Sequence, residues 1–153
     1  YFFVNKEKFL NLKKNNFFIE SAKVFNNFYG SPYTNITKSF KKDKNILFDI
    51  DWQGARKLRK NFDKNQIIDF FILPPNKKEL KRRLEKRGRD NKQEIKMRLS
   101  HALTEIGHHN EYNYVLINDN IHKTVNYLIE IINNNILLSE IKKDVKKKLR
   151  FIK

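Results

Sequence analysis

The sequence predicts an α/β fold in which a parallel β-sheet is covered by helices on both faces. Short apolar runs that read as buried strands alternate with longer segments whose apolar residues recur at helical spacing. This alternation is typical of parallel sheets, whose strands need a crossover connection that is usually a helix. No internal repeat and no linker rich in proline or glycine divides the 153 residues, so a single domain with its own core is expected.

The first predicted elements are a strand remnant at Tyr1–Val4 and a short helix after it. Asn5 is a favoured N-cap residue, and apolar residues at helical spacing predict the buried side of this helix. These residues are Phe9, Leu10 and Leu12.

A second strand is expected over residues 17–25, where apolar and β-branched residues are enriched. The Asn26–Asn27 pair and the Gly30-Ser31-Pro32 stretch are typical turn sequences and should end it. A helix from about Asn35 to Lys42 then leads to a third strand at Ile46–Asp51.

The second half of the chain predicts two further strands, Ile67–Leu73 and Tyr114–Ile117. Pro74-Pro75 stops the first of them, and a capping box of Asn76 and Glu79 starts a helix through Lys86.

A second capping box, formed by Asn91 and Glu94, starts the next helix. Its apolar stripe consists of Ile95, Leu99, Ala102, Leu103 and Ile106. A final helix is predicted by apolar residues at helical spacing: Ile121, Val125, Leu128, Ile129 and Ile132.

In the segment NILFDIDWQG at residues 45–54, a short apolar run ends in acidic residues. If this run is a parallel strand, Asp49 and Asp51 lie at the carboxyl edge of the sheet, where open α/β folds bind ligands. A carboxylate there can hold a magnesium–nucleotide complex or a sugar hydroxyl. A strand followed by an ordinary acidic turn explains this segment alone equally well.

Three arginines stand out against a lysine-rich background: Arg83, Arg87 and Arg98. Arg83 and Arg87 are four residues apart on one helix face, and Arg98 is on the next helix. Two capped helices joined by a turn at residues 87–90 form a candidate flap whose guanidinium groups could close over phosphates. A solvated pair of basic helices remains the alternative.

A second group of polar residues, near the N-terminus, could recognise a nucleotide: Tyr1, Glu20, Tyr29 and Ser31. Phenol hydroxyls bind phosphate oxygens, and a carboxylate on a strand can accept two N–H bonds from a guanine edge. Taken singly, each of these residues is also an ordinary strand or turn residue.

The net charge of +16 first suggests nucleic acid, but the composition argues against specific binding to it. Most basic residues are lysines spread along the chain, and the lysine run from Lys142 to Lys148 is interpreted as a solvated tail. The chain has no cysteine, no secretory signal and no apolar run long enough to span a membrane. These features predict a cytoplasmic protein with no membrane or specific nucleic-acid partner.

Five segments in the same order resemble the guanylate kinase family of nucleoside-monophosphate kinases. They are FFIESAKVFNNFYGS (17–31), FDIDWQGA (48–55), FILPP (71–75), RRLEKRGRD (82–90) and YNYVLIND (112–119). The resemblance covers residues 1 to about 133. It implies a P-loop-type α/β fold in a single domain, with a partial GMP-binding region at residues 1–34, a helical lid at residues 76–107 and the rest as core.

The resemblance also implies individual roles. Tyr1 and Tyr29 match contacts to the GMP phosphate, and Glu20 and Ser31 match guanine-recognising positions. Asp49 and Asp51 match the acidic pair between the two nucleotides, with Asp49 as the implied Mg²⁺ ligand. The implied catalytic residues are Arg83, Arg87 and Arg98, which embrace the phosphates. Asn118 matches a position beside the adenine of ATP.

The family also carries a glycine-rich phosphate loop with Lys and Ser/Thr. None of the four glycines of this chain is followed by Lys-Ser or Lys-Thr. We therefore expect an N-terminally truncated fragment that lacks the P-loop strand and first helix and is inactive alone.

The intact protein is expected to phosphorylate GMP to GDP with ATP and Mg²⁺. The rival interpretation is a catalytically inactive guanylate-kinase-like protein-interaction module, although such modules tend to lose the lid arginines that are present in this chain. ATP and GMP are the implied partners, and a homo-oligomer is left open.

Overall fold

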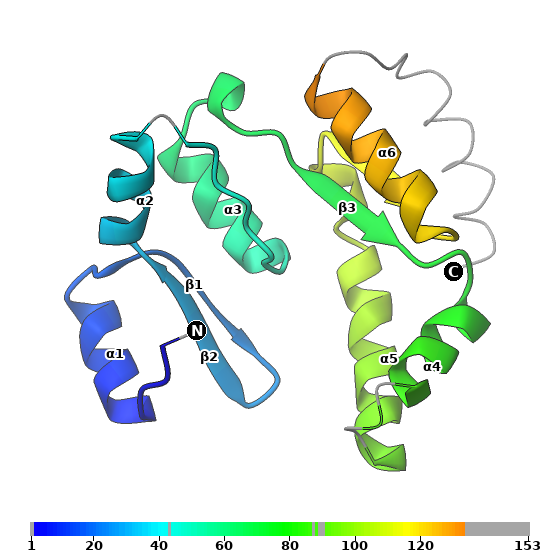
Figure 1. Ribbon diagram of the computed structural model, residues 1–153. Helices are drawn as coiled ribbons and strands as arrows, with labels where there is room; N and C mark the ends of the chain where they lie inside the picture. Colours follow the sequence, from blue (N-terminus) through cyan, green and yellow to red (C-terminus); the bar gives the residue numbers. More distant parts are fainter. Residues whose placement is uncertain (1, 43, 87, 89–90, 134–153) are drawn as a thin grey trace. The chain divides into compact units, whose positions relative to one another are not determined.

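The computed structural model describes residues 2–42, 44–86, 88 and 91–133, in two compact units, Tyr1–Ile67 and Ile68–Lys153 (Figure 1). The first unit contains an antiparallel pair of strands and the second a parallel pair. Helices accompany both pairs, so the fold is α/β, as predicted. Each unit has its own hydrophobic core.

The first unit begins with helix α1 (Lys6–Lys14), which is capped as predicted. The Asn5 side chain accepts a hydrogen bond from the Lys8 backbone N–H at 2.8 Å. Phe9 is buried against the next strand, whereas Leu10, expected on the buried side, is exposed. The expected strand remnant is wrong for its described residues 2–4, which are irregular.

Strands β1 (Phe18–Val24) and β2 (Asn27–Pro32) form a tight hairpin. The prediction of a turn at Gly30-Ser31-Pro32 is wrong, because these residues belong to β2. Gly30 is instead needed for a close approach: a Cβ atom there would lie 2.9 Å from the Phe18 ring. The hairpin places Ser31 directly opposite Glu20.

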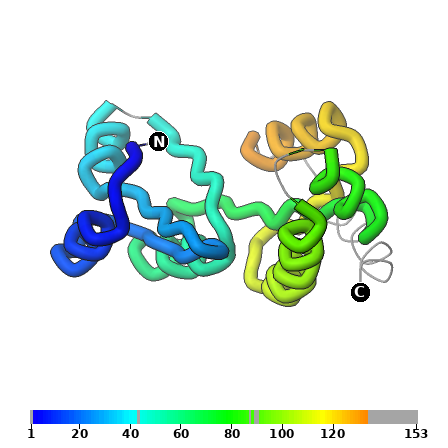
Figure 2. The backbone as a smooth tube through the Cα atoms, turned by 90° about the horizontal axis from the view of Figure 1, so that it is seen from below, coloured from blue at the N-terminus to red at the C-terminus, as the bar shows by residue number. Residues whose placement is uncertain are grey.

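Helices α2 (Tyr33–Phe40) and α3 (Trp52–Asn61) complete the first unit, followed by a short 3₁₀ turn at Lys64–Gln66. Figure 2 traces these elements through the blue-to-turquoise part of the chain. Ile19, Ile36 and Leu58 form the buried core between them. Burial of such side chains stabilises the unit by about 1.5–3 kcal/mol each.

The segment Ile46–Asp51, predicted to be a strand, is irregular in the structure, and that prediction is wrong. A strand obtains its backbone hydrogen bonds from a neighbouring strand, and no strand of the described residues pairs with this segment. Its last residue, Asp51, instead acts as the N-cap of α3.

The second unit is built around the parallel strands β3 (Phe70–Leu73) and β4 (Tyr114–Ile117). The limits of β4 agree with the prediction, whereas β3 begins three residues later than expected. Helices α4 (Lys77–Lys86), α5 (Lys92–Ile106) and α6 (Ile121–Ile132) accompany the strands, with a short 3₁₀ turn at His109–Glu111. The core consists of Leu73, Ile106, Leu116, Ile117 and Ile131.

Two helices of the second unit, α4 and α5, begin at the predicted caps. The Asn91–Glu94 capping box is complete, with bonds of 2.9 and 2.7 Å. Asn76 accepts the Glu79 backbone N–H at 2.8 Å, while the Glu79 carboxylate bonds to two arginines instead.

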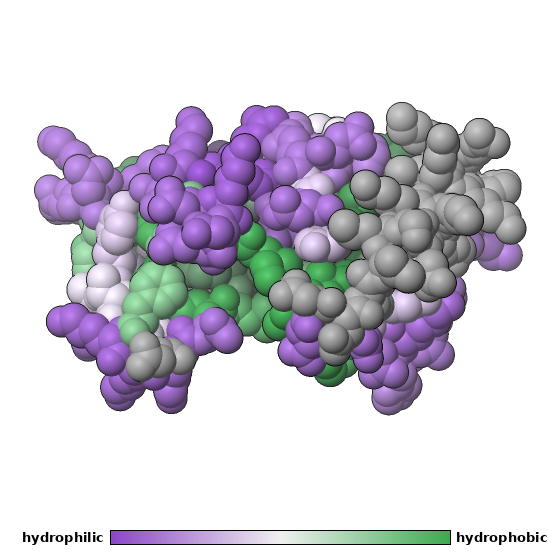
Figure 3. Space-filling view, turned by 90° about the horizontal axis from the view of Figure 1, so that it is seen from above, coloured by the Kyte–Doolittle hydropathy of each residue, from purple (hydrophilic) through white to green (hydrophobic). Residues whose placement is uncertain are grey.

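Helix α6 buries a different side from the one predicted. Thr124 and Ile131 are buried and Leu128 packs on the core. The remaining predicted positions are exposed: Ile121, Val125, Ile129 and Ile132. On the coloured part of the face drawn in Figure 3, hydrophobic side chains are visible beside hydrophilic ones. No helix in the described ranges combines the length and apolar character needed to cross a membrane.

Candidate functional site

The hairpin brings together Glu20 and Ser31, two residues predicted to recognise a base. They are opposite each other in the ladder, and the Ser31 hydroxyl donates a hydrogen bond of 2.6 Å to Glu20 Oε1. Glu20 is only 3% exposed. A buried carboxylate oriented by a hydroxyl group presents hydrogen-bond acceptors in a fixed direction.

The start of α3 closes in on the same carboxylate. A Cβ atom at Gly54 would lie 2.9 Å from Glu20 Oε2 and 3.1 Å from Ile50 Cβ, so any larger residue would force the Glu20 carboxylate or Ile50 to shift. Asp51 Oδ1 accepts the Gly54 N–H at 3.0 Å, and Gln53 Nε2 donates to Asp51 Oδ2 at 2.9 Å. Both oxygens of Asp51 are thereby oriented by the first turn of the helix.

The charge state of Glu20 reflects these surroundings. Burial raises the pKa of its carboxyl group above the ordinary value, and this is the largest influence. The hydrogen bond from Ser31 and the positive charge of Lys57 lower the pKa, while the negative charge of Asp51 raises it. The ionisation of the Glu20 carboxyl group therefore depends on its burial and on Ser31, Lys57 and Asp51.

Three other residues are predicted to contact GMP. Tyr29 is 45% exposed and lies two residues before Ser31 in β2, so both are on one face of the hairpin. Asp49 is exposed on the irregular segment before α3. Tyr1 lies outside the described residues.

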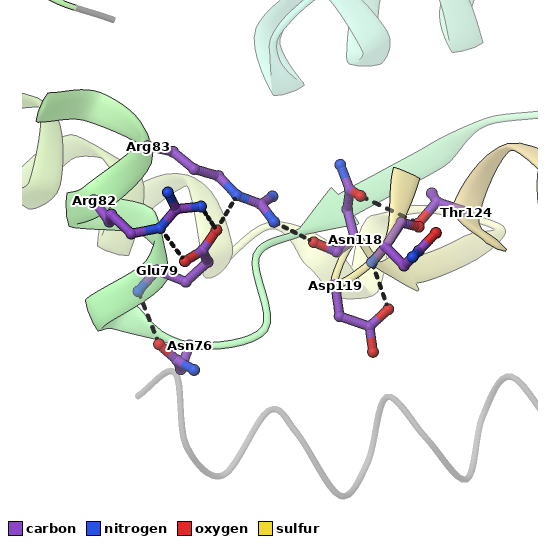
Figure 4. A network of polar contacts seen from close by, with 8 residues as sticks. Asn76, Glu79, Arg82, Arg83, Asn118, Asp119 and Thr124 are labelled. Atoms are coloured by element: carbon purple, nitrogen blue, oxygen red, sulfur yellow. Dashed lines mark hydrogen bonds and ion pairs between the residues drawn. The ribbon is translucent and has the colours of Figure 1, made fainter. Parts of the chain in front are cut away.

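A second polar cluster occupies the C-terminal edge of the parallel strands in the other unit (Figure 4). Arg83 on α4 donates from Nε to Glu79 Oε1 at 2.7 Å and from Nη2 to the Asn118 carbonyl oxygen at 2.8 Å. Asn118 follows β4 directly, and its N–H extends the ladder to the Leu73 carbonyl oxygen at 2.7 Å. Open α/β sheets bind ligands at this edge.

Glu79 orients the arginines of this cluster. Arg82 forms a bidentate pair with its carboxylate, through two bonds of 2.7 Å, and Arg83 shares Oε1. Hydrogen bonds from Arg82 and then Arg83 lower the pKa of Glu79 to about 2. The carboxylate is therefore ionised at neutral pH and fixes the direction of the Arg83 guanidinium.

The structure brings Arg83 and Asn118 together, two residues predicted to serve the phosphates and the ATP base. Arg98 lies half-buried on α5, which packs against α4. Arg87 and the turn at residues 87–90 fall outside the described residues, except for Gly88. Among the residues described, no three His, Cys, Asp or Glu side chains are grouped to hold a metal.

Three residues of the two polar clusters were not identified as functional candidates from the sequence. Glu79 was interpreted only as a capping residue, and its spacing of three and four from Arg82 and Arg83 was the available signal. Gly54 and Lys57 gave no signal alone, because their role depends on α3 packing against β1.

Comparison with known proteins identifies the family. The family model described as guanylate kinase matches residues 1–135. The guanylate kinase of Rickettsia prowazekii is 44% identical over 132 residues, which are 86% of this chain and 66% of that protein. The guanylate kinase of Blochmanniella pennsylvanica is 40% identical over 151 residues, which are 99% of this chain and 68% of that protein.

A solved structure of a guanylate kinase also matches this chain. The crystal structure of guanylate kinase from Anaplasma phagocytophilum matches with a TM-score of 0.73 and 32% identity. The match covers 97% of this chain and 74% of that one. The chain spans about two thirds of the length of these two curated relatives. The family match, the sequence identities and the shared fold together show that this chain belongs to the guanylate kinase family.

Proposed function

We propose that the intact protein containing these residues transfers a phosphoryl group from ATP to GMP, giving GDP. Family membership supports this reaction, and the buried Glu20–Ser31 pair is the observation that carries the choice of base. Guanine presents two N–H donors on its Watson–Crick edge, and an ionised carboxylate accepts both. Adenine lacks that pattern and would leave Glu20 unpaired, which is costly in a buried site.

The remaining residues of the first unit have supporting roles in this proposal. Tyr29, on the same hairpin face as Ser31, and Tyr1 bind the GMP phosphate through their hydroxyl groups. Asp51, oriented by Gln53 and Gly54, contacts the GMP nucleoside.

Mg²⁺ enters the proposal together with the ATP phosphates. Proteins bind this ion through one or two carboxylates, and phosphate oxygens and water complete its octahedral shell. The exposed carboxylate of Asp49 fits such a limited contribution, and no dedicated metal cage is found among the described residues. The ion supplies neutralisation of developing phosphate charge when it is bound.

Arginine side chains of the second unit would stabilise the phosphoryl group during transfer. Arg83 is held at the C-terminal edge of β4 by Glu79 and by the Asn118 carbonyl, so its guanidinium is oriented before nucleotide arrives. Arg87 and Arg98 are proposed to complete the arginine group, and Asn118 to lie beside the adenine of ATP. Residues 76–107 would then form the lid.

Residues 1–153 alone are proposed to lack kinase activity. Phosphoryl transfer depends on a cradle of backbone amides and a lysine around the β- and γ-phosphates. None of the four glycines of the sequence is followed by Lys-Ser or Lys-Thr, so this cradle would come from residues of the intact protein other than 1–153.

A coupled assay that detects ADP and GDP formation tests the proposal. The intact protein should turn over GMP with ATP and Mg²⁺, and residues 1–153 should not. An intact protein that binds neither nucleotide would support the protein-interaction module instead. Turnover by residues 1–153 alone would show that phosphate is bound by a different mechanism.

A further inference from the structure

Lys57 is held against β1 beside the residue proposed to read the base. Its ammonium group donates to the carbonyl oxygen of Ser21 and lies 3.2 Å from the Ser21 hydroxyl oxygen. Ser21 follows Glu20 directly in the strand and is itself buried. Lysine side chains usually extend into water, so an ammonium group turned onto a strand backbone is an unusual placement.

The packing of α3 explains why Lys57 reaches this position. Gly54, Lys57 and Asn61 are spaced three and four residues apart, so they share one face of the helix. Gly54 approaches the Glu20 carboxylate, Lys57 bonds to Ser21, and Asn61 Nδ2 donates to the Ile19 carbonyl oxygen at 3.2 Å. One helix face therefore fixes three successive residues of β1.

The charges acting on Glu20 oppose one another. Asp51, at the N-terminus of α3, favours the protonated form, as does burial. Lys57, six residues after Asp51, favours the ionised form, and Ser31 from β2 stabilises it by its hydrogen bond. Among the described groups that act on this carboxyl, Lys57 supplies the positive charge.

We propose that Lys57 is a positioning residue for base recognition: it fixes β1 at Ser21 and supplies the positive charge that keeps the Glu20 carboxylate ionised for guanine. This inference rests on the function proposed above. A protonated Glu20 would offer a donor where guanine also offers donors, so loss of the Lys57 charge should weaken GMP binding most at acidic pH.

The test measures KM for GMP and kcat of the intact protein between pH 5.5 and 8.5. Lys57→Met should raise KM for GMP by roughly tenfold at the acid end of this range, because Glu20 would be protonated more readily without the nearby positive charge. The acid limb should move to higher pH, because the removed charge had lowered the pKa of Glu20. kcat at saturating GMP and KM for ATP should change less than about twofold, since the loss concerns ground-state binding of GMP.

Three further variants separate charge, tether and fold. Lys57→Arg keeps the charge and should restore the parental pH profile. Lys57→Gln keeps a donor for Ser21 without the charge and should show the displaced profile even if Lys57→Met fails to fold. Lys60→Met, at an exposed position on the same helix, is the matched control and should behave like the parent.

The outcomes distinguish this inference from the proposed function. A parent protein without GMP phosphorylation would contradict the proposed function. An active parent whose Lys57→Gln and Lys57→Met variants keep its KM for GMP at every pH would overturn the role of Lys57 and leave the function intact. A loss in kcat alone would also overturn it, because positioning of the base should appear in GMP binding.

Discussion

Replacement of Glu20 by glutamine tests guanine recognition with a minimal change in shape. Glutamine keeps an oxygen that can accept the Ser31 hydroxyl, now 2.6 Å from Glu20 Oε1. The second oxygen becomes an NH₂ group, which would face the N–H donors of guanine. The variant therefore keeps the shape that packs against Gly54 and removes the acceptor that we propose to read the base.

The expected magnitude follows from the hydrogen bonds lost. A hydrogen bond to a charged group contributes about 1.5–3 kcal/mol, and a donor that faces another donor in a buried site adds a desolvation cost of about 1–3 kcal/mol. At 1.4 kcal/mol for each factor of ten, KM for GMP should rise by roughly two orders of magnitude or more. KM for ATP should be unchanged.

Steady-state kinetics of the intact protein with GMP varied at saturating ATP–Mg²⁺ measure this effect. Thermal unfolding provides the control. Because burial raises the pKa of Glu20, its ionisation destabilises the fold at pH 7, so Glu20→Gln should unfold at the same or a higher temperature there. A higher unfolding temperature of the variant should disappear below pH 4.5, the ordinary pKa of the carboxyl group, because Glu20 is then protonated in both the folded and the unfolded protein. Unchanged GMP kinetics in a folded variant would refute the role of Glu20.

Three further changes test other parts of the site. Gly54→Ala would place a methyl group 2.9 Å from Glu20 Oε2, so it should raise KM for GMP by about tenfold and lower stability by about 1–3 kcal/mol, and equal KM would contradict the close approach. Arg83→Ala should lower kcat by about 10²–10³-fold, and Arg83→Lys should rescue it only in part; an effect confined to KM would mean that Arg83 only captures nucleotide. Glu79→Gln should lower the unfolding temperature at pH 7, where the ionised carboxylate stabilises the fold. The difference from the parent should vanish as the pH falls from 4.5 towards 2, because Glu79, whose pKa is lowered to about 2, becomes protonated in the folded protein over this range. A difference that persists at pH 2 would show that the arginine pairs are not its cause.

Local signals predicted the starts of α1, α4 and α5. Asn5, Asn91 and Asn76 cap their helices as expected, because an N-cap bond involves residues only three positions apart. Strand β4 was also predicted correctly, since its apolar run is bounded by polar residues on both sides.

Elements that depend on distant partners were predicted less well. Ile46–Asp51 has the composition of a buried strand, but composition cannot supply the neighbour that a strand needs. Strand β2 was missed because Gly30 and Pro32 resemble turn residues, whereas Gly30 makes room for the Phe18 ring. On α6, the helical period was right but the buried side was not, because Thr124 faces the core in place of Val125.

The candidate site, too, could be predicted only in part. Glu20, Ser31 and Arg83 were selected from residue type and spacing, and Asn118 from the match to a family. In the structure, Ser31 bonds to Glu20, and Arg83 bonds to the carbonyl oxygen of Asn118. The residues that orient them could not be predicted from spacing alone. Gly54, for example, became relevant only once α3 was seen against the Glu20 carboxylate.

A competition experiment tests the central claim most directly. The intact protein would be supplied with equal concentrations of GMP and AMP together with ATP and Mg²⁺, and the formation of GDP and of ADP from AMP would be followed by chromatography with labelled nucleotides. A site built to hydrogen-bond guanine should favour GMP by about 10⁴-fold, because AMP would leave the buried carboxylate of Glu20 unpaired. Comparable phosphorylation of AMP would contradict recognition of guanine by the Glu20–Ser31 pair.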